Sequence, residues 1–292
     1  MKLATFVRNN RLRLGALCVR NGRQIMVDLQ EAEPRLPDDM LSFLRQGEEA
    51  RCMAAAAIAR VTDGIALEEV KLKAPIPNPG KIICIGLNYR DHAAETGQSI
   101  PEYPAIFSKY ANAVIGPDEP IVLPRVSQKV DYEGEMGVVI GRRGRYIPED
   151  RALDYVAGYL PCNDVSARDF QKRTSQWTIG KTFDTFAPMG PALVTTDEIP
   201  DPHTLDIRVY VSGELMQSSN TQNLIFSVPY LVAYLSQVMT LEPGDVILTG
   251  TPGGVGDVRT PPRYLQPGDE VRVEITRLGV LRNPVTSEAE RS

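Results

Sequence analysis

The sequence predicts an α+β protein with a small N-terminal domain over residues 1–73 and a larger, strand-rich domain over residues 74–292. Beyond residue 81, strand-like and helix-like segments do not alternate, which argues against a doubly wound parallel sheet. In the first seventy residues, short strand-like runs precede helix-like ones. Between the two parts lies Ala74-Pro75-Ile76-Pro77-Asn78-Pro79-Gly80, which predicts an extended linker because proline can neither continue a helix nor occupy a central strand.

The small domain is predicted to begin as a β-meander and to continue with helices. The apolar or alternating runs are Leu3–Val7, Leu12–Val19 and Ile25–Leu29, and the turns between them are Asn9-Asn10 and Asn21-Gly22. Asn-Gly is a strong signal for a two-residue hairpin turn. A helix start is expected at Asp38-Asp39, and the alanine-rich segment Glu48–Arg60 predicts a further helix.

The larger domain is predicted to consist mainly of strands and turns. The expected strands are Lys81–Gly86, Ile121–Leu123, Gly134–Ile140, Ala192–Thr195, Leu205–Val211, Val246–Thr249 and Val271–Ile275. One helix is expected from Asn163 or Asp164 through Lys172, near a candidate site. Another is expected over Ser227–Gln237, where apolar residues recur at helical spacing.

Composition and charge exclude several classes of protein. A hydrophobic share of 42% with 24% charged residues is typical of a globular chain and argues against disorder. The net charge of −5, without a long run of either sign, argues against a nucleic-acid partner. The longest uncharged apolar stretch, Met53–Ala59, is far shorter than the roughly 18 residues of a membrane span.

The ends and the cysteines predict a cytoplasmic protein. The apolar run Leu3–Val7 stops at Arg8 and is shorter than the roughly 7–15 residues of a secretory signal core. The four cysteines, Cys18, Cys52, Cys84 and Cys162, lie far apart with no Cys-x-x-Cys pair. We therefore expect reduced, mostly buried thiols and neither a zinc site nor a disulfide framework.

An acidic pair opens one of the predicted strands. Glu133 and Glu135, in Asp131-Tyr132-Glu133-Gly134-Glu135, lie two residues apart, so the pleat of the strand directs both carboxylates to one face. One interpretation is a solvated face of an edge strand. The other is a pair of ligands for a divalent cation, which would remove the repulsion between the two charges.

A second candidate lies on the predicted helix after Asn163. Asp164, Arg168 and Gln171 would fall at positions i, i+4 and i+7 and present an anion, a cation and an amide on one stripe. Such a stripe suits the binding of a small polar anion beside a metal. The alternative is an N-cap aspartate followed by an intrahelical ion pair.

A histidine and a glycine-rich turn add two further candidates. His92 and Glu95, at i and i+3, would share a helix face, where the carboxylate could orient the imidazole and raise its basicity; a surface pair is the alternative. The other histidine, His203, is expected in a proline-rich turn facing solvent. The glycines around Thr251 lack a following Lys-Ser/Thr, so they predict a turn that lets the Thr251 hydroxyl approach a ligand, not a phosphate loop.

Taken together, these segments resemble the fumarylacetoacetate hydrolase family over roughly residues 75–285. The matching motifs are Ile85-Gly86-Leu87-Asn88-Tyr89, Asp131-Tyr132-Glu133-Gly134-Glu135, Asn163-Asp164-Val165-Ser166-Ala167-Arg168-Asp169, Gly180-Lys181-Thr182-Phe183-Asp184 and Leu248-Thr249-Gly250-Thr251-Pro252. The resemblance implies a mixed β-roll or β-sandwich catalytic domain behind a small N-terminal domain of the bacterial two-domain type. It also implies a homodimer and a bound Mg²⁺ or Mn²⁺.

The resemblance assigns roles to nine residues. The implied metal ligands are Glu133, Glu135 and Asp164. The implied substrate-binding residues are Arg168, Gln171, Lys181 and Thr251. The implied catalytic residues are His92, Glu95 and Lys181. Carboxylate oxygens are the ligands that Mg²⁺ and Mn²⁺ prefer, which agrees with the implied metal.

These residues predict a metal-dependent hydrolase that cleaves a C–C bond in small 2,4-dioxo acids, such as acylpyruvates or fumarylacetoacetate-like compounds. The 2-oxo acid would chelate the cation, His92 would activate a water, and the products would be pyruvate or a related 2-oxo acid and a carboxylate. Two alternatives remain open on the same scaffold: an oxaloacetate-type decarboxylase and an isomerase of the 2-hydroxymuconate or 2-hydroxyhepta-2,4-dienedioate type. A non-catalytic binding protein is the remote alternative.

Overall fold

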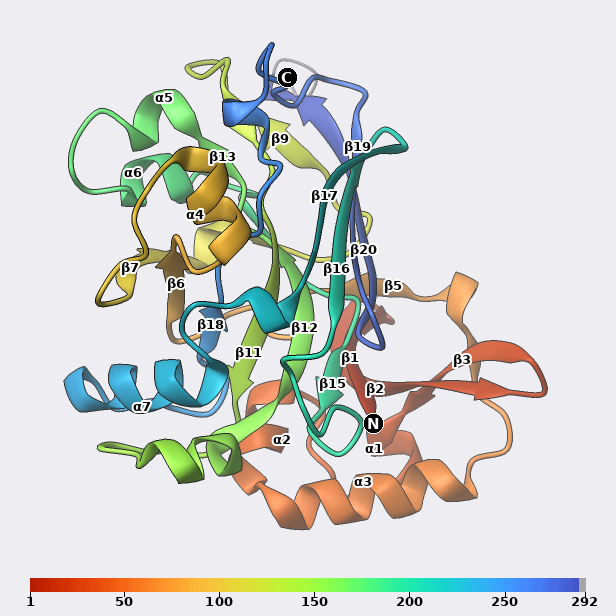
Figure 1. Ribbon diagram of the computed structural model, residues 1–292. Coiled ribbons are helices and arrows are strands. Elements are labelled where there is room, and N and C mark those ends of the chain that lie inside the picture. The colour runs from red at the N-terminus through yellow and green to blue at the C-terminus, as the bar shows by residue number, and fades with distance from the viewer. Residues whose placement is uncertain (289–292) are drawn as a thin grey trace.

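The computed structural model describes residues 1–288, and its first 73 residues form the predicted meander followed by helices (Figure 1). The strands are β1 (Lys2–Arg8), β2 (Arg11–Arg20), β3 (Arg23–Asp28), β4 (Ile65–Ala66) and β5 (Lys71–Lys73). The helices are α1 (Leu29–Ala32), α2 (Met40–Gln46) and α3 (Glu48–Arg60), with the 3-10 turn η1 (Leu67–Glu69). Both predicted hairpin turns are confirmed, and the Asp39 carboxylate accepts a hydrogen bond from Ser42 N as the N-cap of α2.

The remaining chain is rich in strands, as expected. The first large sheet adds β6 (Ile82–Gly86), β7 (Ala105–Lys109), β11 (Gly134–Ile140), β12 (Val156–Asn163), β15 (Leu193–Thr195) and β18 (Val246–Leu248). The second contains β9 (Ile121–Leu123), β16 (Asp206–Val211), β17 (Glu214–Asn220), β19 (Glu270–Ile275) and β20 (Gly279–Ser287). Two small pairs are β8 (Val114–Ile115) with β14 (Ala187–Pro188), and β10 (Val130–Asp131) with β13 (Ser166–Ala167).

Short helices connect these strands. They are α4 (Arg90–Thr96), α5 (Arg168–Gln171), α6 (Thr178–Lys181) and α7 (Val228–Val238), with the 3-10 turns η2 (Ala111–Ala113), η3 (Glu149–Tyr155), η4 (Thr221–Asn223) and η5 (Gly256–Val258). Helix α7 confirms the predicted segment, and the Ser227 hydroxyl caps it by accepting from Tyr230 N. The seven strands predicted in this part are all present, with ends within one residue of the expected ones.

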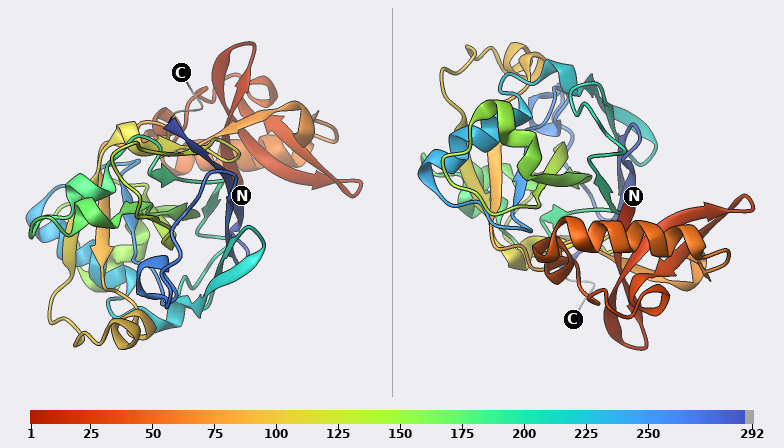
Figure 2. Two further views of the ribbon diagram at one scale, coloured as in Figure 1. Left: turned by 90° about the horizontal axis from the view of Figure 1, so that it is seen from above. Right: turned by 90° about the horizontal axis from the view of Figure 1, so that it is seen from below.

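One continuous sheet runs through both parts of the chain. Its strand order is β4-β3-β2-β1-β15-β12-β11-β18-β6-β7, and β5 pairs with β1. The N-terminal elements lie to one side of the remaining chain (Figure 2), but β1 pairs with β15. The division at residues 73 and 74 therefore stays a prediction, and the meander is hydrogen-bonded to the larger part.

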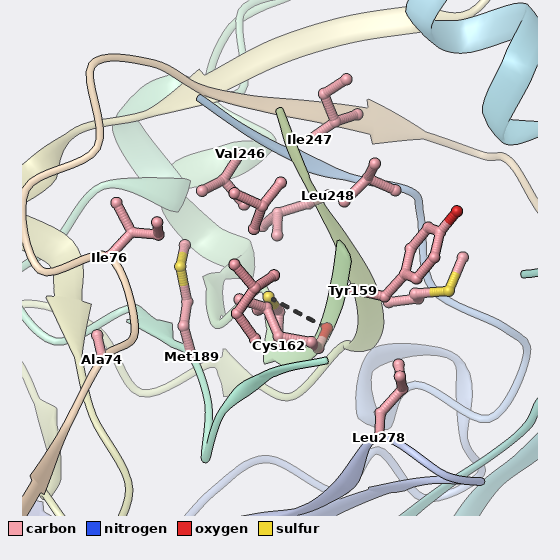
Figure 3. Close-up of a cluster of buried hydrophobic side chains, with 14 of the residues drawn as sticks. Ala74, Ile76, Tyr159, Cys162, Met189, Val246, Ile247, Leu248 and Leu278 are labelled. Atoms are coloured by element: carbon pink, nitrogen blue, oxygen red, sulfur yellow. Dashed lines mark hydrogen bonds between the residues drawn. The ribbon is translucent and has the colours of Figure 1, made fainter. Parts of the chain in front are cut away.

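The predicted linker packs into the core. Ala74 and Ile76 are 3% and 0% exposed, and they lie in a buried cluster with side chains such as Met189 and Leu278 (Figure 3). The second sheet packs against β11 and β12 (Figure 1). The two sheets come so close at Gly134 that an added Cβ would lie 2.2 Å from Val209 Cγ2.

The helix predicted from Asn163 or Asp164 through Lys172 is wrong over most of its length. Strand β12 continues to Asn163, Asp164 N donates to Glu133 O at 2.8 Å, and β13 pairs with β10. Only α5 is helical. The backbone of this segment therefore bonds to neighbouring chain segments rather than within a helix, and Asn163, Asp164 and Arg168 are buried.

Two sequence-based exclusions can be compared with the described residues. Within residues 1–288, no helix has the length and hydropathy needed to cross a bilayer. The four cysteines are all free; Cys84 and Cys162 are buried, whereas Cys18 is half-buried and Cys52 is exposed.

Candidate active site

The three acidic residues converge where β11 and β12 pair. Gly134 pairs with Asn163 in this antiparallel ladder. Asp164, the residue after Asn163, therefore lies beside Glu133 and Glu135, the two neighbours of Gly134. The Asn163 side chain also links the two strands, because its Oδ1 accepts a hydrogen bond from Glu133 N at 2.9 Å. One carboxylate oxygen from each acid lies within 4.8 Å of the others, and the three residues are 6%, 1% and 0% exposed. This burial excludes the solvated edge-strand interpretation.

Two buried lysines contact the cluster. Lys181 Nζ donates to Glu133 Oε2 and to Asp164 Oδ2, both at 2.7 Å. Lys109 Nζ donates to Asp164 Oδ1 at 2.5 Å and to Val165 O at 2.9 Å. Burial lowers the pKa of Lys181, but Asp164 and Glu133 outweigh burial and raise it above its ordinary value. For Lys109, burial prevails over Asp164 and the pKa is lowered.

Glu135 is the acid that no cation neutralises among the described residues. Its Oε2 accepts a hydrogen bond from Gly250 N at 2.7 Å, and no ion pair reaches it within residues 1–288. Burial, together with Asp164 and Glu133, raises its pKa well above the ordinary value. Burial also acts on Glu133, but Lys181 and Arg168 outweigh it and hold the pKa of that carboxyl far below the ordinary value.

The cluster has the donor chemistry of a divalent-cation site. Four buried carboxylates, the three acids and Asp131, face the cations Lys109, Lys181 and Arg168, which leaves one formal negative charge uncompensated near Glu135. Hard oxygen donors converging within a few ångströms suit Mg²⁺ or Mn²⁺. A bound cation would relieve the repulsion that acts on Glu135, so the residues present fit the implied metal.

Arg168 and Gln171 also reach the cluster, although not as a helical stripe. Arg168 Nε donates to Asp131 Oδ2 at 2.8 Å, and its Nη1 lies 2.6 Å from Glu133 Oε1. The same Nη1 donates to Gln171 Oε1 at 2.9 Å. Arg168 thus pairs with Asp131 and Glu133, and the alternative of an N-cap Asp164 paired with Arg168 along one helix is wrong.

His92 lies on α4, so the segment is helical and His92 and Glu95 share one face, as their spacing indicated for a helix. His92 Nδ1 is 3.4 Å from Glu95 Oε2, and the same carboxylate oxygen accepts from Gly254 N at 2.9 Å. Contact with Glu95 engages Nδ1, and within residues 1–288 no hydrogen bond engages Nε2 of His92. The other histidine, His203, pairs with Asp201 and accepts from Val228 N at 3.1 Å, so it supports the start of α7.

Thr251 holds the turn after β18 against the segment Glu133–Glu135 at the start of β11, which we call the metal-ligand strand. Its hydroxyl donates to Gly134 O at 3.0 Å and accepts from Gln217 Nε2 at 2.8 Å. Gln217 and Lys109 both contact the site, and neither was predicted. Each is a single polar residue in a strand, without a surrounding motif that would have identified it.

A cavity of about 270 Å³ opens over the cluster. The predicted site residues that line it are His92, Glu133, Glu135, Arg168, Gln171, Lys181 and Thr251. Phe107 and Trp177 form part of its wall and pack edge to face at 5.5 Å. Trp177 lies so close to Gly86 that a Cβ there would be 2.3 Å from the indole ring. The space suits a small polar acid.

All nine predicted site residues therefore lie at or beside one cavity. Asp164 contributes its carboxylate from beneath, and Glu95 contacts the site through His92. Their positions are structural findings, whereas their roles in binding and catalysis stay predictions.

The chain is similar in sequence to a known protein family and to named relatives. The family model described as fumarylacetoacetate (FAA) hydrolase C-terminal matches residues 81–286. The chain is 50% identical over 262 residues to the Bos taurus protein named oxaloacetate tautomerase FAHD2B, mitochondrial, covering 89% of this chain and 83% of that one.

Two solved structures are also similar. A putative HpcE protein from Mycobacterium smegmatis matches with a TM-score of 0.87 and 39% identity, covering 99% of this chain and 100% of that chain. The maleylpyruvate hydrolase from Sphingobium sp. SYK-6, in complex with manganese(II) ion and pyruvate, has a TM-score of 0.80 and 33% identity, covering 98% and 99%. That hydrolase binds a metal and a 2-oxo acid, which are the kinds of ligand predicted for the present cavity.

Proposed function

The chain belongs to the fumarylacetoacetate hydrolase family, and on that premise we propose that it is a divalent-metal-dependent enzyme that interconverts the keto and enol forms of a small 2-oxo dicarboxylic acid such as oxaloacetate. The observation that most directly supports a metal-dependent enzyme is the buried cluster of Glu133, Glu135 and Asp164 beneath a small cavity. The relative that is 50% identical, and whose name is oxaloacetate tautomerase, supports this choice of reaction.

This proposal gives priority to proton transfer over C–C bond hydrolysis. The sequence-based hypothesis of hydrolysis is supported at the level of the family, which includes a maleylpyruvate hydrolase. The more similar relative supports the alternative, in which the same activated 2-oxo acid exchanges a proton and no bond between carbons is broken. Both reactions need the same stabilised enolate.

The charges of the site favour an anionic ligand once a metal is bound. Glu133, Glu135 and Asp164 would hold the cation, which would polarise the 2-keto group and stabilise its enolate. Counted with Asp131, Arg168 and the two lysines, the formal net charge of the cluster then changes from −1 to +1. Arg168, Gln171 and Thr251 line the cavity and would bind the carboxylate of the acid, which orients it for reaction.

His92 is the candidate base for the proton transfer. Glu95 would accept a hydrogen bond from Nδ1–H of the imidazole, which leaves Nε2 unprotonated and able to remove a proton from C3. The imidazolium so formed would then give this proton to the oxygen on C2, which regenerates the neutral His92. The sum is the movement of one proton from carbon to oxygen, with no water consumed.

The proposal is tested by following the ultraviolet absorbance of the oxaloacetate enol with Mg²⁺ or Mn²⁺ and again after chelation. We expect the protein to accelerate its decay and the chelator to return the rate to the background value. Pyruvate release from oxaloacetate and cleavage of an acylpyruvate are measured in parallel. The proposal fails if the protein leaves the decay of the enol unchanged, whether or not it accelerates either of the other two reactions.

Hydrolysis of a 2,4-dioxo acid is the second candidate function. It is favoured by the His92–Glu95 pair, which could activate a water as well as remove a proton, and by the similarity to the maleylpyruvate hydrolase. Decarboxylation and isomerisation use the same enolate and are distinguished in the same set of assays. A non-catalytic binding protein would give no turnover in any of them.

Replacing His92 by alanine is expected to lower kcat for tautomerisation about 10²–10⁴-fold, the usual contribution of a general base. His203→Ala is the matched control, because the sequence contains two histidines and this one lies outside the cavity. Steady-state kinetics of both variants check the prediction. Equal losses in the two variants, or none in His92→Ala, would contradict the role of the His92 imidazole.

Assembly and location stay predictions. A homodimer is implied by the resemblance alone, and a small 2-oxo acid is the proposed partner. The cytoplasmic location expected for this chain differs from that of the Bos taurus relative, whose name places it in the mitochondrion.

A further inference from the structure

We propose that strand β17 (Glu214–Asn220) is a positioning element of the active site, with Gln217 fixing the metal-ligand strand and Ser219 fixing the helix that carries His92. The two side chains lie two residues apart on one strand of the second sheet. They therefore tie the acidic cluster and α4 to the same rigid support. This inference rests on the proposed function only for its activity measurements.

A β-bulge directs Gln217 into the protein. Along the β16–β17 ladder, Val209 pairs with Gln217 but the next residue, Tyr210, pairs with Leu215, so Met216 is the extra, unpaired residue. As a result, the adjacent residues Met216 and Gln217 are both buried, at 4% and 1% exposure. Regular alternation would have placed one of them on the opposite face. Bulges are common beside active sites, where they redirect a side chain in this way.

The amide of Gln217 connects three backbone and side-chain groups of the site. Its Oε1 accepts from Gly134 N at 2.9 Å, and Gly134 is the residue between the ligands Glu133 and Glu135. Its Nε2 donates to Thr251 Oγ1 and to Pro252 O, both at 2.8 Å. A single buried side chain thus sets the spacing between the metal-ligand strand and the turn that follows β18.

Ser219 fixes the position of α4, the helix that carries His92. Its hydroxyl donates a hydrogen bond to Asp91 Oδ2, and Asp91 Oδ1 accepts from His92 N at 2.8 Å. At the other end of the helix, Glu95 accepts from Gly254 N. The helix is therefore held at its first turn by β17 and at its last turn by the glycine-rich turn that Gln217 also fixes.

Gln217 and Ser219 are positioning residues because they act through other groups. Neither lines the cavity, whereas Thr251 and His92, which they support, do. Partners of this kind typically change metal affinity or activity about 10–100-fold when removed. The two residues support different groups, so their removal should affect different measurements.

The test compares Gln217→Met, Ser219→Ala and the control Ser218→Ala, whose side chain is exposed on the same strand. Mn²⁺ affinity is read from the quenching of Trp177, the one tryptophan of the chain, which lines the cavity. We expect Gln217→Met to raise the Mn²⁺ Kd about tenfold or more. We expect Ser219→Ala to leave that Kd within about twofold of the wild-type value but to lower kcat about tenfold, and Ser218→Ala to change neither.

Melting temperatures separate positioning from simple loss of stability. A purely structural role for Gln217 would lower the melting temperature equally with and without Mn²⁺, whereas a positioning role reduces the increment that Mn²⁺ produces. If Gln217→Met does not fold, Gln217→Asn, which keeps the amide on a shorter side chain, is expected to show the same loss of affinity in weaker form.

A wild-type Mn²⁺ Kd in Gln217→Met, or in Gln217→Asn where that variant is used, would overturn the proposal for Gln217. A wild-type kcat in Ser219→Ala would overturn it for Ser219, and so would an equal loss in Ser218→Ala. Mn²⁺ affinity does not depend on the identity of the substrate. If the wild-type protein binds Mn²⁺ but leaves oxaloacetate unchanged, the proposed function fails while the positioning role of Gln217 stands.

Discussion

Replacing Glu135 by glutamine is expected to lower metal-dependent turnover about 10³-fold while raising the melting temperature of the metal-free protein. Glutamine has the same shape and can still accept the hydrogen bond from Gly250 N, so the local fold is kept. It removes the buried charge that Asp164 and Glu133 repel. It also removes one anionic ligand, and Lewis-acid stabilisation by the metal is worth several kcal/mol, at about 1.4 kcal/mol per factor of ten.

Thermal melting with and without Mn²⁺, combined with steady-state kinetics, checks both parts of the Glu135→Gln prediction. Glu119→Gln is the matched control, because Glu119 is a partly buried glutamate that forms an ion pair with Lys73 outside the cavity. Although burial opposes it, Lys73 holds the pKa of Glu119 below its ordinary value. Neutralising Glu119 should therefore lower stability near neutral pH and leave the Mn²⁺ response intact. An unchanged Mn²⁺ response in Glu135→Gln would contradict the metal site.

Elements with local signals were predictable from the sequence. The two Asn-containing turns, the helix start at Asp39 and the helical spacing of α7 depend on residues within a few positions of one another. The same holds for His92 and Glu95, whose contact follows from one turn of helix. For these features, the hydrogen bonds that define the structure are formed within the segment itself.

Features that depend on distant pairing were not predictable. The segment after Asn163 has polar residues at helical spacing, but its backbone bonds to β10 and to Glu133, the residue before β11, and the local pattern contains neither. Lys109 reaches Asp164 because β7 pairs with β6, and Gln217 turns inward because of a bulge. A single polar residue in a strand carries no signal of which strand will lie beside it.

The case of Asp164 shows that a correct residue can follow from an incorrect element. Asp164 and Arg168 were expected on one helical stripe, and the structure places both at Glu133 by a different route. The cross-strand pairing of β11 and β12 brings Asp164 beside the acidic pair. The ligand set was predicted from the resemblance to a family. The periodicity of the segment, in contrast, predicted a helical backbone where most of the segment is not helical.

Replacing Lys181 by methionine is expected to have the opposite effect on stability from Glu135→Gln. Lys181 is 1% exposed and donates to both Glu133 and Asp164 at 2.7 Å. Removal of this ammonium leaves Asp164 with Lys109 and Glu133 with Arg168 as their remaining cationic partners, at a cost of about 3–5 kcal/mol. For a chain of this length, that cost corresponds to a decrease of roughly 5–8 °C in the melting temperature of the metal-free protein.

Mn²⁺ should restore part of the stability that Lys181→Met loses, because the cation compensates the same carboxylates as the missing ammonium. The increment produced by Mn²⁺ should therefore be larger than in the wild type, while kcat falls because the keto oxygen and the substrate carboxylate lose a nearby positive charge. Lys172→Met is the control: its ammonium is mostly exposed and pairs with Asp257 at the cavity rim, so the metal-free melting temperature should change little. A smaller Mn²⁺ increment in Lys181→Met than in the wild type would show that the ammonium and the metal do not compensate the same charges, and the electrostatic account of the site would be wrong.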